Sequence, residues 1–111
     1  MKVSVEPTKT GIARIVLDGR LDVAGTQAAE AEFNAAVSAG PNVIVDLGNV
    51  PFIASVGIRM LVAGTCTQKS LGGKMVMMGP DEVTRKILKT TGIDQLVPVR
   101  ASLEEALASF G

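Results

Sequence analysis

Histidine, tryptophan and tyrosine are absent from the chain, and cysteine occurs only once, as Cys66. Histidine is the commonest acid–base residue and metal ligand at neutral pH, so serine or cysteine nucleophiles activated by an imidazole are excluded. One cysteine without histidine does not supply a typical structural zinc site and cannot close an internal disulfide. We therefore expect Cys66 to be a packed small hydrophobic residue, no metal or cofactor to be required, and the protein not to be an enzyme.

An excess of charge of either sign is also lacking, because 11 basic residues are balanced by 11 acidic ones. No basic surplus is available to neutralise phosphates, and three phenylalanines offer little for base stacking, which argues against nucleic acid as a partner. No apolar run reaches the roughly 20 residues of a membrane span, and the first residues lack the apolar segment of a secretory signal. The chain is expected to be soluble and cytoplasmic, with no membrane span.

The apolar residues that are present follow the periods of strands and helices in alternation. With 47% hydrophobic and 20% charged residues, the composition predicts one folded domain over residues 1–111. The order predicts an α/β fold, a single-domain mixed, largely parallel sheet of about five strands with about four helices. The predicted strands cover residues 2–7, 11–19, 42–47, 73–79 and 96–99, and the predicted helices cover residues 22–40, those from Ser55 onward, 80–92 and 102–111.

The helix expected after Ser55 has two apolar faces. Its core face is predicted to carry Ile58, Leu61, Val62 and Thr65. The opposite face carries Val56, Met60, Ala63 and Thr67. These side chains are unusually apolar and small for a face in water, so this face is either a second covered layer or a partner surface. With helices layered over a single sheet, the partner surface is favoured.

A lone serine interrupts the most hydrophobic passage, NVPFIASVGIRMLVAG over residues 49–64, where this helix begins. In one interpretation Ser55 is simply the N-cap, whose hydroxyl accepts from a backbone N–H two or three residues later. In the other it has a functional role, at a helix start whose unpaired N–H groups and positive dipole end can hold a phosphate. The role of Asp22 is also undecided, because either Asp22 or Thr26 can cap the helix predicted over 22–40.

The segment from the end of the strand at 42–47 resembles the signature of the anti-sigma-factor antagonists, the STAS domain family. Asp46 and Leu47 match the end of the family's strand, and Phe52 matches the aromatic residue of its loop. Ser55 falls on the family's phosphorylated serine, and Gly57 on its glycine.

The resemblance extends to both sides of this segment. LDGRLDVAG is similar to the family's Leu-x-Gly-x-Leu-Asp, with Asp22 at the acidic position, and TTGIDQLVPVRASLEEAL is similar to its C-terminal strand and helix. The chain departs from the pattern at two positions. Ala54 replaces the aspartate that commonly precedes the serine, and Val56 replaces a second small hydroxyl residue.

The resemblance implies a phosphorylation-switched binding protein. Unphosphorylated, it would bind an anti-sigma factor and free a sigma factor for transcription. That partner would be a serine kinase that itself binds the ATP used to phosphorylate Ser55, and a phosphatase would reset the system. The residues expected to contact the partner are Asp22, Ala54, Val56, Gly57, Arg59, Met60 and Ala63.

Two other hypotheses compete with this one. Ala54 and Val56 are also compatible with a scaffold that does not switch, or with an accessory subunit of a signalling or transport complex. The βα alternation suits a receiver domain with Asp46 as phospho-acceptor. However, Pro51 lies five residues beyond Asp46 rather than four, and no acidic pair follows the strand predicted over 11–19.

Overall fold

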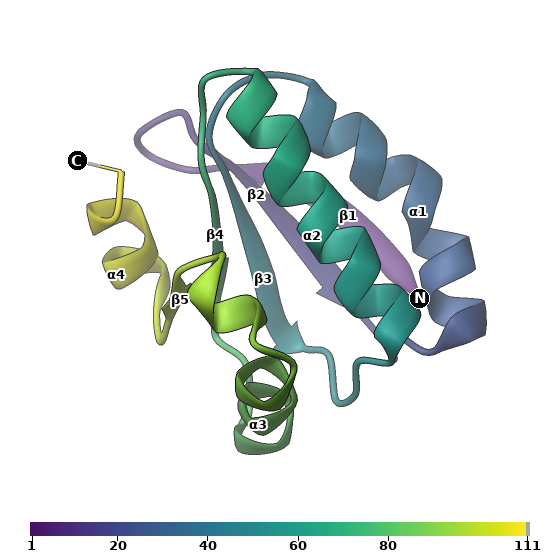
Figure 1. Cartoon of the computed structure of the whole chain (residues 1–111). Helices are drawn as coiled ribbons and strands as arrows, with labels where there is room; N and C mark the ends of the chain where they lie inside the picture. Colours follow the sequence, from purple (N-terminus) through teal and green to yellow (C-terminus); the bar gives the residue numbers. More distant parts are fainter. Residues whose placement is uncertain (111) are drawn as a thin grey trace.

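A five-stranded sheet forms the centre of the computed structural model, which describes residues 1–110 (Figure 1). The strands lie in chain order, β1-β2-β3-β4-β5. β1 pairs with β2 antiparallel, and the other three pairings are parallel. The predicted mixed, largely parallel sheet is therefore confirmed. The strands are β1 (Lys2–Pro7), β2 (Ala13–Asp18), β3 (Val43–Asn49), β4 (Met75–Met78) and β5 (Val99–Arg100).

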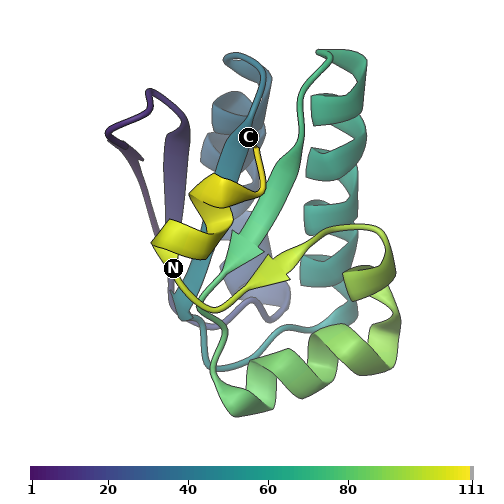
Figure 2. The ribbon, with the colours of Figure 1, turned by 90° about the vertical axis from the view of Figure 1, so that its left-hand side faces the viewer.

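Four α-helices surround the sheet, as predicted. α1 and α2 lie side by side on one face, and α4 lies on the other (Figure 2). The helices are α1 (Val23–Ser38), α2 (Ser55–Ser70), α3 (Glu82–Thr91) and α4 (Leu103–Ala108), with a short 3₁₀ helix η1 (Ile93–Gln95). The helix predicted over 102–111 includes Gly111, which is outside the described residues. Across residues 1–110, no helix is both long enough and apolar enough to cross a membrane.

Helix starts agree with the capping residues in the sequence. Asp22 Oδ1 accepts a hydrogen bond from Gly25 N at 2.8 Å, which makes Asp22 rather than Thr26 the cap of α1. Ser102 Oγ accepts from Glu105 N at 3.2 Å at the start of α4. These side chains satisfy N–H groups that the first turn of a helix leaves unpaired.

The two faces of the sheet have separate apolar layers. Val45 of β3 belongs to the large core cluster beneath α1 and α2, which also contains Phe33 and Leu61. Ile44, the next residue back, packs with Ala106 of α4 on the opposite side. Both faces of β3 are covered, and this explains why its sequence is apolar without alternation.

The orientation of α2 differs from the predicted one. Leu61 and Thr65 are buried as predicted, and Ile58 packs partly buried against the core, but Met60, placed on the outward face, is only 6% exposed. The face of α2 that packs against the rest of the protein is centred on Gly57, Leu61, Gly64 and Gln68, all of which are buried. A periodicity that counts apolar side chains overlooks glycines, although glycines allow the closest approach of a helix to its neighbours. Cys66, predicted to be packed, is exposed.

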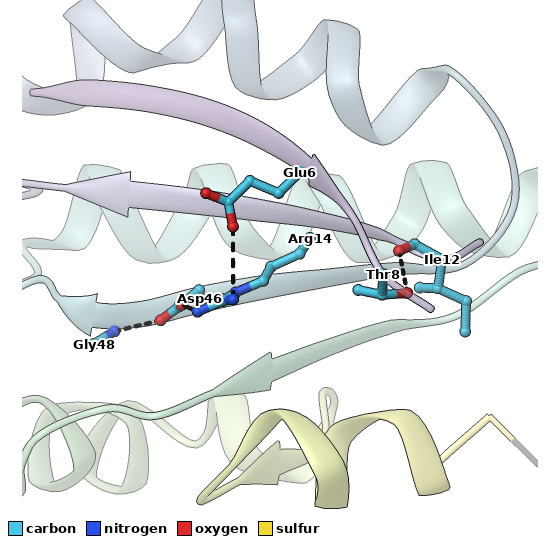
Figure 3. A network of polar contacts seen from close by, with 6 residues as sticks. All are labelled: Glu6, Thr8, Ile12, Arg14, Asp46 and Gly48. Carbon is cyan, nitrogen blue, oxygen red and sulfur yellow. Dashed lines mark hydrogen bonds and ion pairs between the residues drawn. The ribbon is translucent and has the colours of Figure 1, made fainter. Parts of the chain in front are cut away.

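Asp46, the phospho-acceptor of the receiver hypothesis, is held in an ion pair on the α4 side of the sheet (Figure 3). Arg14 Nε donates to Asp46 Oδ2 at 3.0 Å, and Gly48 N donates to Asp46 Oδ1 at 2.8 Å. The Asp46 residue is only 7% exposed. Receiver domains have strand order 2-1-3-4-5, whereas this sheet runs in chain order with an antiparallel β1. The receiver hypothesis is therefore wrong.

Replacing Arg14 by methionine is expected to lower the free energy of unfolding by about 2 kcal/mol, because a nearly buried carboxylate loses its main partner. The loss is smaller than for a fully buried pair because the Arg14 side chain is 29% exposed. Urea denaturation measures this difference. Arg85→Met, at an exposed arginine of α3, is the control, and equal losses in the two variants would contradict a structural role for the pair.

Candidate functional site

The segments that precede α1 and α2 are joined by backbone hydrogen bonds. Leu21 and Ile53 form an isolated parallel bridge. Leu21 N donates to Phe52 O at 2.9 Å, and Ala54 N donates to Leu21 O at 2.8 Å. The residues after this bridge begin the two helices, so Asp22 and Ser55 lie at neighbouring helix starts. The structure thus brings together two residues that are 33 positions apart in the sequence.

Ser55 is the first residue of α2 and is exposed. The N-cap is Ala54, and no side-chain hydrogen bond caps this helix. The first helical bond runs from Ile58 N to Ala54 O at 3.0 Å. The interpretation of Ser55 as an N-cap is therefore wrong, because the serine is one residue too late in the chain. Its position leaves the hydroxyl on the surface beside the N–H groups of the first turn.

A cation and an aromatic ring flank the two helix starts. The Arg20 guanidinium lies over the Phe52 ring, 4.6 Å from its centroid. Arg20 Nε also lies 3.6 Å from Asp22 Oδ2, the oxygen that does not cap α1. Arg20 therefore connects Phe52, which precedes the serine, to the acidic residue of the other segment. Sequence reasoning missed Arg20 because it occupies a variable position of the Leu-x-Gly-x-Leu-Asp pattern.

Gly57 lies where α2 comes closest to the bridge between the two segments. A Cβ atom at this position would lie 2.9 Å from Leu21 Cβ and 3.0 Å from Ile53 Cγ2. Distances this short require the neighbours to move. Gly57 is buried and therefore has a packing role at the site; its predicted contact with a partner stays a prediction.

A groove of about 350 Å³ runs between α1 and α2, and Val56, the residue after Ser55, is part of its lining. Four predicted partner residues line it from α2: Val56, Arg59, Met60 and Ala63. α1 contributes residues that sequence reasoning did not assign to the site: Val23, Thr26, Gln27, Glu30 and Asn34. Helix packing decides which α1 side chains face α2, and α1 is too rich in alanine for its sequence to show that face.

The groove combines apolar and polar groups. Val23 is 57% exposed and is one of the most exposed large apolar residues of the described chain. Met60 forms part of the floor, being nearly buried, whereas Arg59 and Ala63 are exposed. Thr26 is 4% exposed, and its Oγ1 has no hydrogen-bond partner. Such a surface suits contact with another protein better than it suits binding of a small charged ligand.

Comparison with known proteins identifies the family of the chain. The profile of the STAS domain matches residues 5–106. BtrV of Bordetella bronchiseptica, described as a candidate anti-sigma factor antagonist, is 29% identical over 101 residues, which are 90% of this chain and 87% of BtrV. The anti-sigma-F factor antagonist RsfB of Mycobacterium tuberculosis is 28% identical over 100 residues, covering 87% of this chain and 80% of RsfB.

The fold comparison gives the same result. The crystal structure of an anti-sigma factor antagonist from Mycobacterium paratuberculosis superposes with a TM-score of 0.87 and 26% identity, covering 98% of this chain and 92% of that one. Because the family profile spans nearly the whole chain and the fold superposes on that of an anti-sigma factor antagonist, the protein belongs to the STAS domain family.

Proposed function

We propose that this protein is an anti-sigma-factor antagonist that binds an anti-sigma factor through the groove between α1 and α2, and that phosphorylation of Ser55 releases it. In this proposal the partner is a serine kinase that carries the ATP, and a phosphatase restores the binding form. The protein itself is a substrate and a binding protein rather than an enzyme. The observation that carries the proposal is an exposed serine, free of a capping role, directly before Val56, which lines the groove.

The helix start supports phosphorylation without loss of the fold. A phosphoserine adds about −1.5 to −2 charges, which the N-terminal end of a helix tolerates or favours. The first turn of α2 contains no acidic residue. Ala54, where the family commonly has aspartate, removes a negative charge that would repel the phosphate. The Asp22 carboxylate is bonded to Gly25 N and lies near Arg20, so its charge is partly compensated.

The switch then acts on the partner. A dianion at Ser55 would lie at the edge of the groove, where the partner must approach Val56 and Arg59. Like-charge repulsion with acidic partner groups and the added volume both oppose docking. Phosphorylation therefore weakens binding while the domain stays folded.

The proposal is tested by using wild type, Ser55→Asp and Ser55→Ala as baits in native cytosol. Wild type and Ser55→Ala should capture an ATP-binding, kinase-like protein, and Ser55→Asp should bind the purified partner at least about tenfold more weakly, a difference of 1.4 kcal/mol. With ATP, the partner should phosphorylate wild type but not Ser55→Ala, as read by mass spectrometry.

Ser38→Asp is the matched control, because Ser38 is an exposed serine at the far end of α1. This variant should bind like wild type. Equal capture of the same partners by wild type and Ser55→Asp would reject the switch. It would instead support the second hypothesis, a STAS scaffold or accessory subunit of a signalling or transport complex.

A further inference from the structure

The outer edge of β1 has no pairing partner within residues 1–110. β1 pairs only with β2, and Figure 2 shows this hairpin at the margin of the molecule with no element outside it. Val5 in the middle of β1 is 54% exposed. The unpaired N–H and C=O groups of such an edge readily add another strand.

The sequence of β1 is complementary to itself when two copies run antiparallel. With Ser4 opposite Ser4 of a second copy, Lys2 faces Glu6 and Val3 faces Val5 across the new strand pair. Centring the pair on Val3 or on Val5 instead leaves Lys2 or Glu6 opposite an uncharged residue or unpaired. Charges on edge strands often prevent association, but in this register they attract at two symmetric positions.

The charges of the neighbouring strand continue this pattern. Within the chain, Lys2 lies opposite Asp18, and Glu6 lies opposite Arg14 of β2. Arg14 Nη1 is 3.6 Å from Glu6 Oε1, and the same guanidinium binds Asp46 (Figure 3). In the paired arrangement a single row of opposed residues would read Asp18, Lys2, then Glu6 and Arg14 of the second copy, and that Arg14 reaches diagonally to Asp46, which lies opposite Val16. Its signs alternate from end to end.

The apolar side chains of β1 meet on the other face of the sheet. Val3 and Val5 lie opposite Leu17 and Ile15 in the β1–β2 ladder, so they share the face covered by α1 and α2. Val3 packs against the core cluster, whereas Val5 is the more exposed of the two. Pairing each Val3 with a Val5 of the second copy would cover the exposed Val5 side chains of both copies.

We infer that the protein self-associates through β1, forming a symmetric dimer with a continuous ten-stranded sheet centred on Ser4. The two-fold axis is then normal to the sheet, so both α1–α2 grooves lie on one side and the two Ser55 residues lie at opposite ends. The dimer leaves both sites open and presents them as a bivalent surface. Because strand pairing along one edge buries little area compared with stable dimer interfaces, its association depends on concentration.

Two single charge reversals test this register by sedimentation velocity of the full chain over a concentration series. Lys2→Glu places Glu opposite Glu6, and Glu6→Lys places Lys opposite Lys2, so each variant alone should self-associate at least about tenfold more weakly than wild type. Mixed together they should form a heterodimer of near wild-type affinity, because both cross-strand pairs again have opposite charges. Lys9→Glu, in the hairpin turn outside β1, should dimerise like wild type.

A cysteine scan tests the same geometry independently. Opposed residues of antiparallel strands have Cα atoms about 4.5–5.5 Å apart, within disulfide range. In a Cys66→Ser background, Ser4→Cys should form a symmetric intermolecular disulfide on mild oxidation, and Glu6→Cys should not. A wild type that stays monomeric at all concentrations, a dimer indifferent to both charge reversals, or equal cross-linking at positions 4 and 6 would overturn the proposal.

Discussion

Replacing Gln68 by leucine is expected to lower the free energy of unfolding by about 3–5 kcal/mol, although the two side chains are of similar size. Gln68 is 0% exposed on the core side of α2. Its amide Nε2 donates to Val37 O at 2.7 Å and to Gly40 O at 2.9 Å, and its Oε1 accepts from Asn42 N at 2.6 Å. The side chain therefore satisfies three backbone groups, one at the end of α1 and two in the connection from α1 to β3.

Leucine fills the same space but leaves those three groups without partners. Each unsatisfied buried polar group costs about 1–3 kcal/mol, with the lower values where water reaches it. Asn42 has a φ of 72°, in the left-handed region, which asparagine adopts more readily than most residues other than glycine. Without the Gln68 bond, this turn loses one of the contacts that hold it in place.

Denaturant unfolding followed by circular dichroism measures the loss, and Gln27→Leu is the matched control. Gln27 is an exposed glutamine on α1, so its replacement should change stability by no more than about 0.5 kcal/mol. Gln68→Glu should also be less stable than wild type, since it keeps an acceptor for Asn42 N but removes both donors. Equal stabilities of Gln68→Leu and Gln27→Leu would contradict the hydrogen-bonding role of Gln68.

Local patterns in the sequence predicted most elements of this fold, although the strand predicted over 96–99 shares only Val99 with β5 and η1 was not predicted. Alternation in β1 and β2, the uninterrupted apolar run of β3, and capping residues such as Asp22 and Ser102 each depend on neighbours within a few positions. The alternating order of strands and helices then predicts the parallel sheet. Because these signals depend on short stretches of sequence, they predict helices and strands without knowledge of tertiary contacts.

Features that depend on contacts between distant segments were not predictable in the same way. The orientation of α2 is determined by Gly57 and Gly64, whose missing side chains admit Leu21 and Phe33, and by Gln68, a polar residue in the core. None of the three is counted by an apolar periodicity. This is why Met60 was placed on the outer face although it is nearly buried.

In the candidate site, too, some residues could be identified from the sequence and others depend on contacts between distant segments. Ser55 and Asp22 were identified by the family resemblance, and the structure places them at adjacent helix starts. Arg20 and the α1 side of the groove depend on how two helices and two segments meet. The sequence could predict which α2 residues share one face of that helix. It could not predict which α1 residues lie opposite them across the groove.

Gly57→Val is expected to cost about 3 kcal/mol of stability, at the upper end of overpacking effects, and to weaken partner binding with it. The Cβ atom alone would lie 2.9 Å from Leu21 Cβ and 3.1 Å from Leu21 O. The two γ-methyl groups of valine add further volume in the same narrow space. Relief requires α2 to move away from the bridge between Leu21 and Ile53, which holds the two helix starts together.

Gly57→Ala separates this packing from helix propensity, because alanine favours a helix over glycine by about 1 kcal/mol. If close contact dominates, Gly57→Ala unfolds at lower denaturant than wild type despite this gain. Gly40→Ala is the control, since a Cβ there meets no atom within 4 Å. An increase in stability for Gly57→Ala would show that α2 and Leu21 are further apart in solution.

The Gly57 variants, compared with Ser55→Asp, distinguish the packing that holds the two helix starts together from the effect of a negative charge at Ser55. Leu21 and Ile53 hold Asp22 and Ser55 at neighbouring helix starts, so stability and partner affinity should fall together from wild type through Gly57→Ala to Gly57→Val. Ser55→Asp should lose affinity alone, because an exposed residue at a helix start tolerates a negative charge. Partner binding that stayed constant across the Gly57 series would mean that the partner does not need both helix starts, and the contact surface would then be confined to α2.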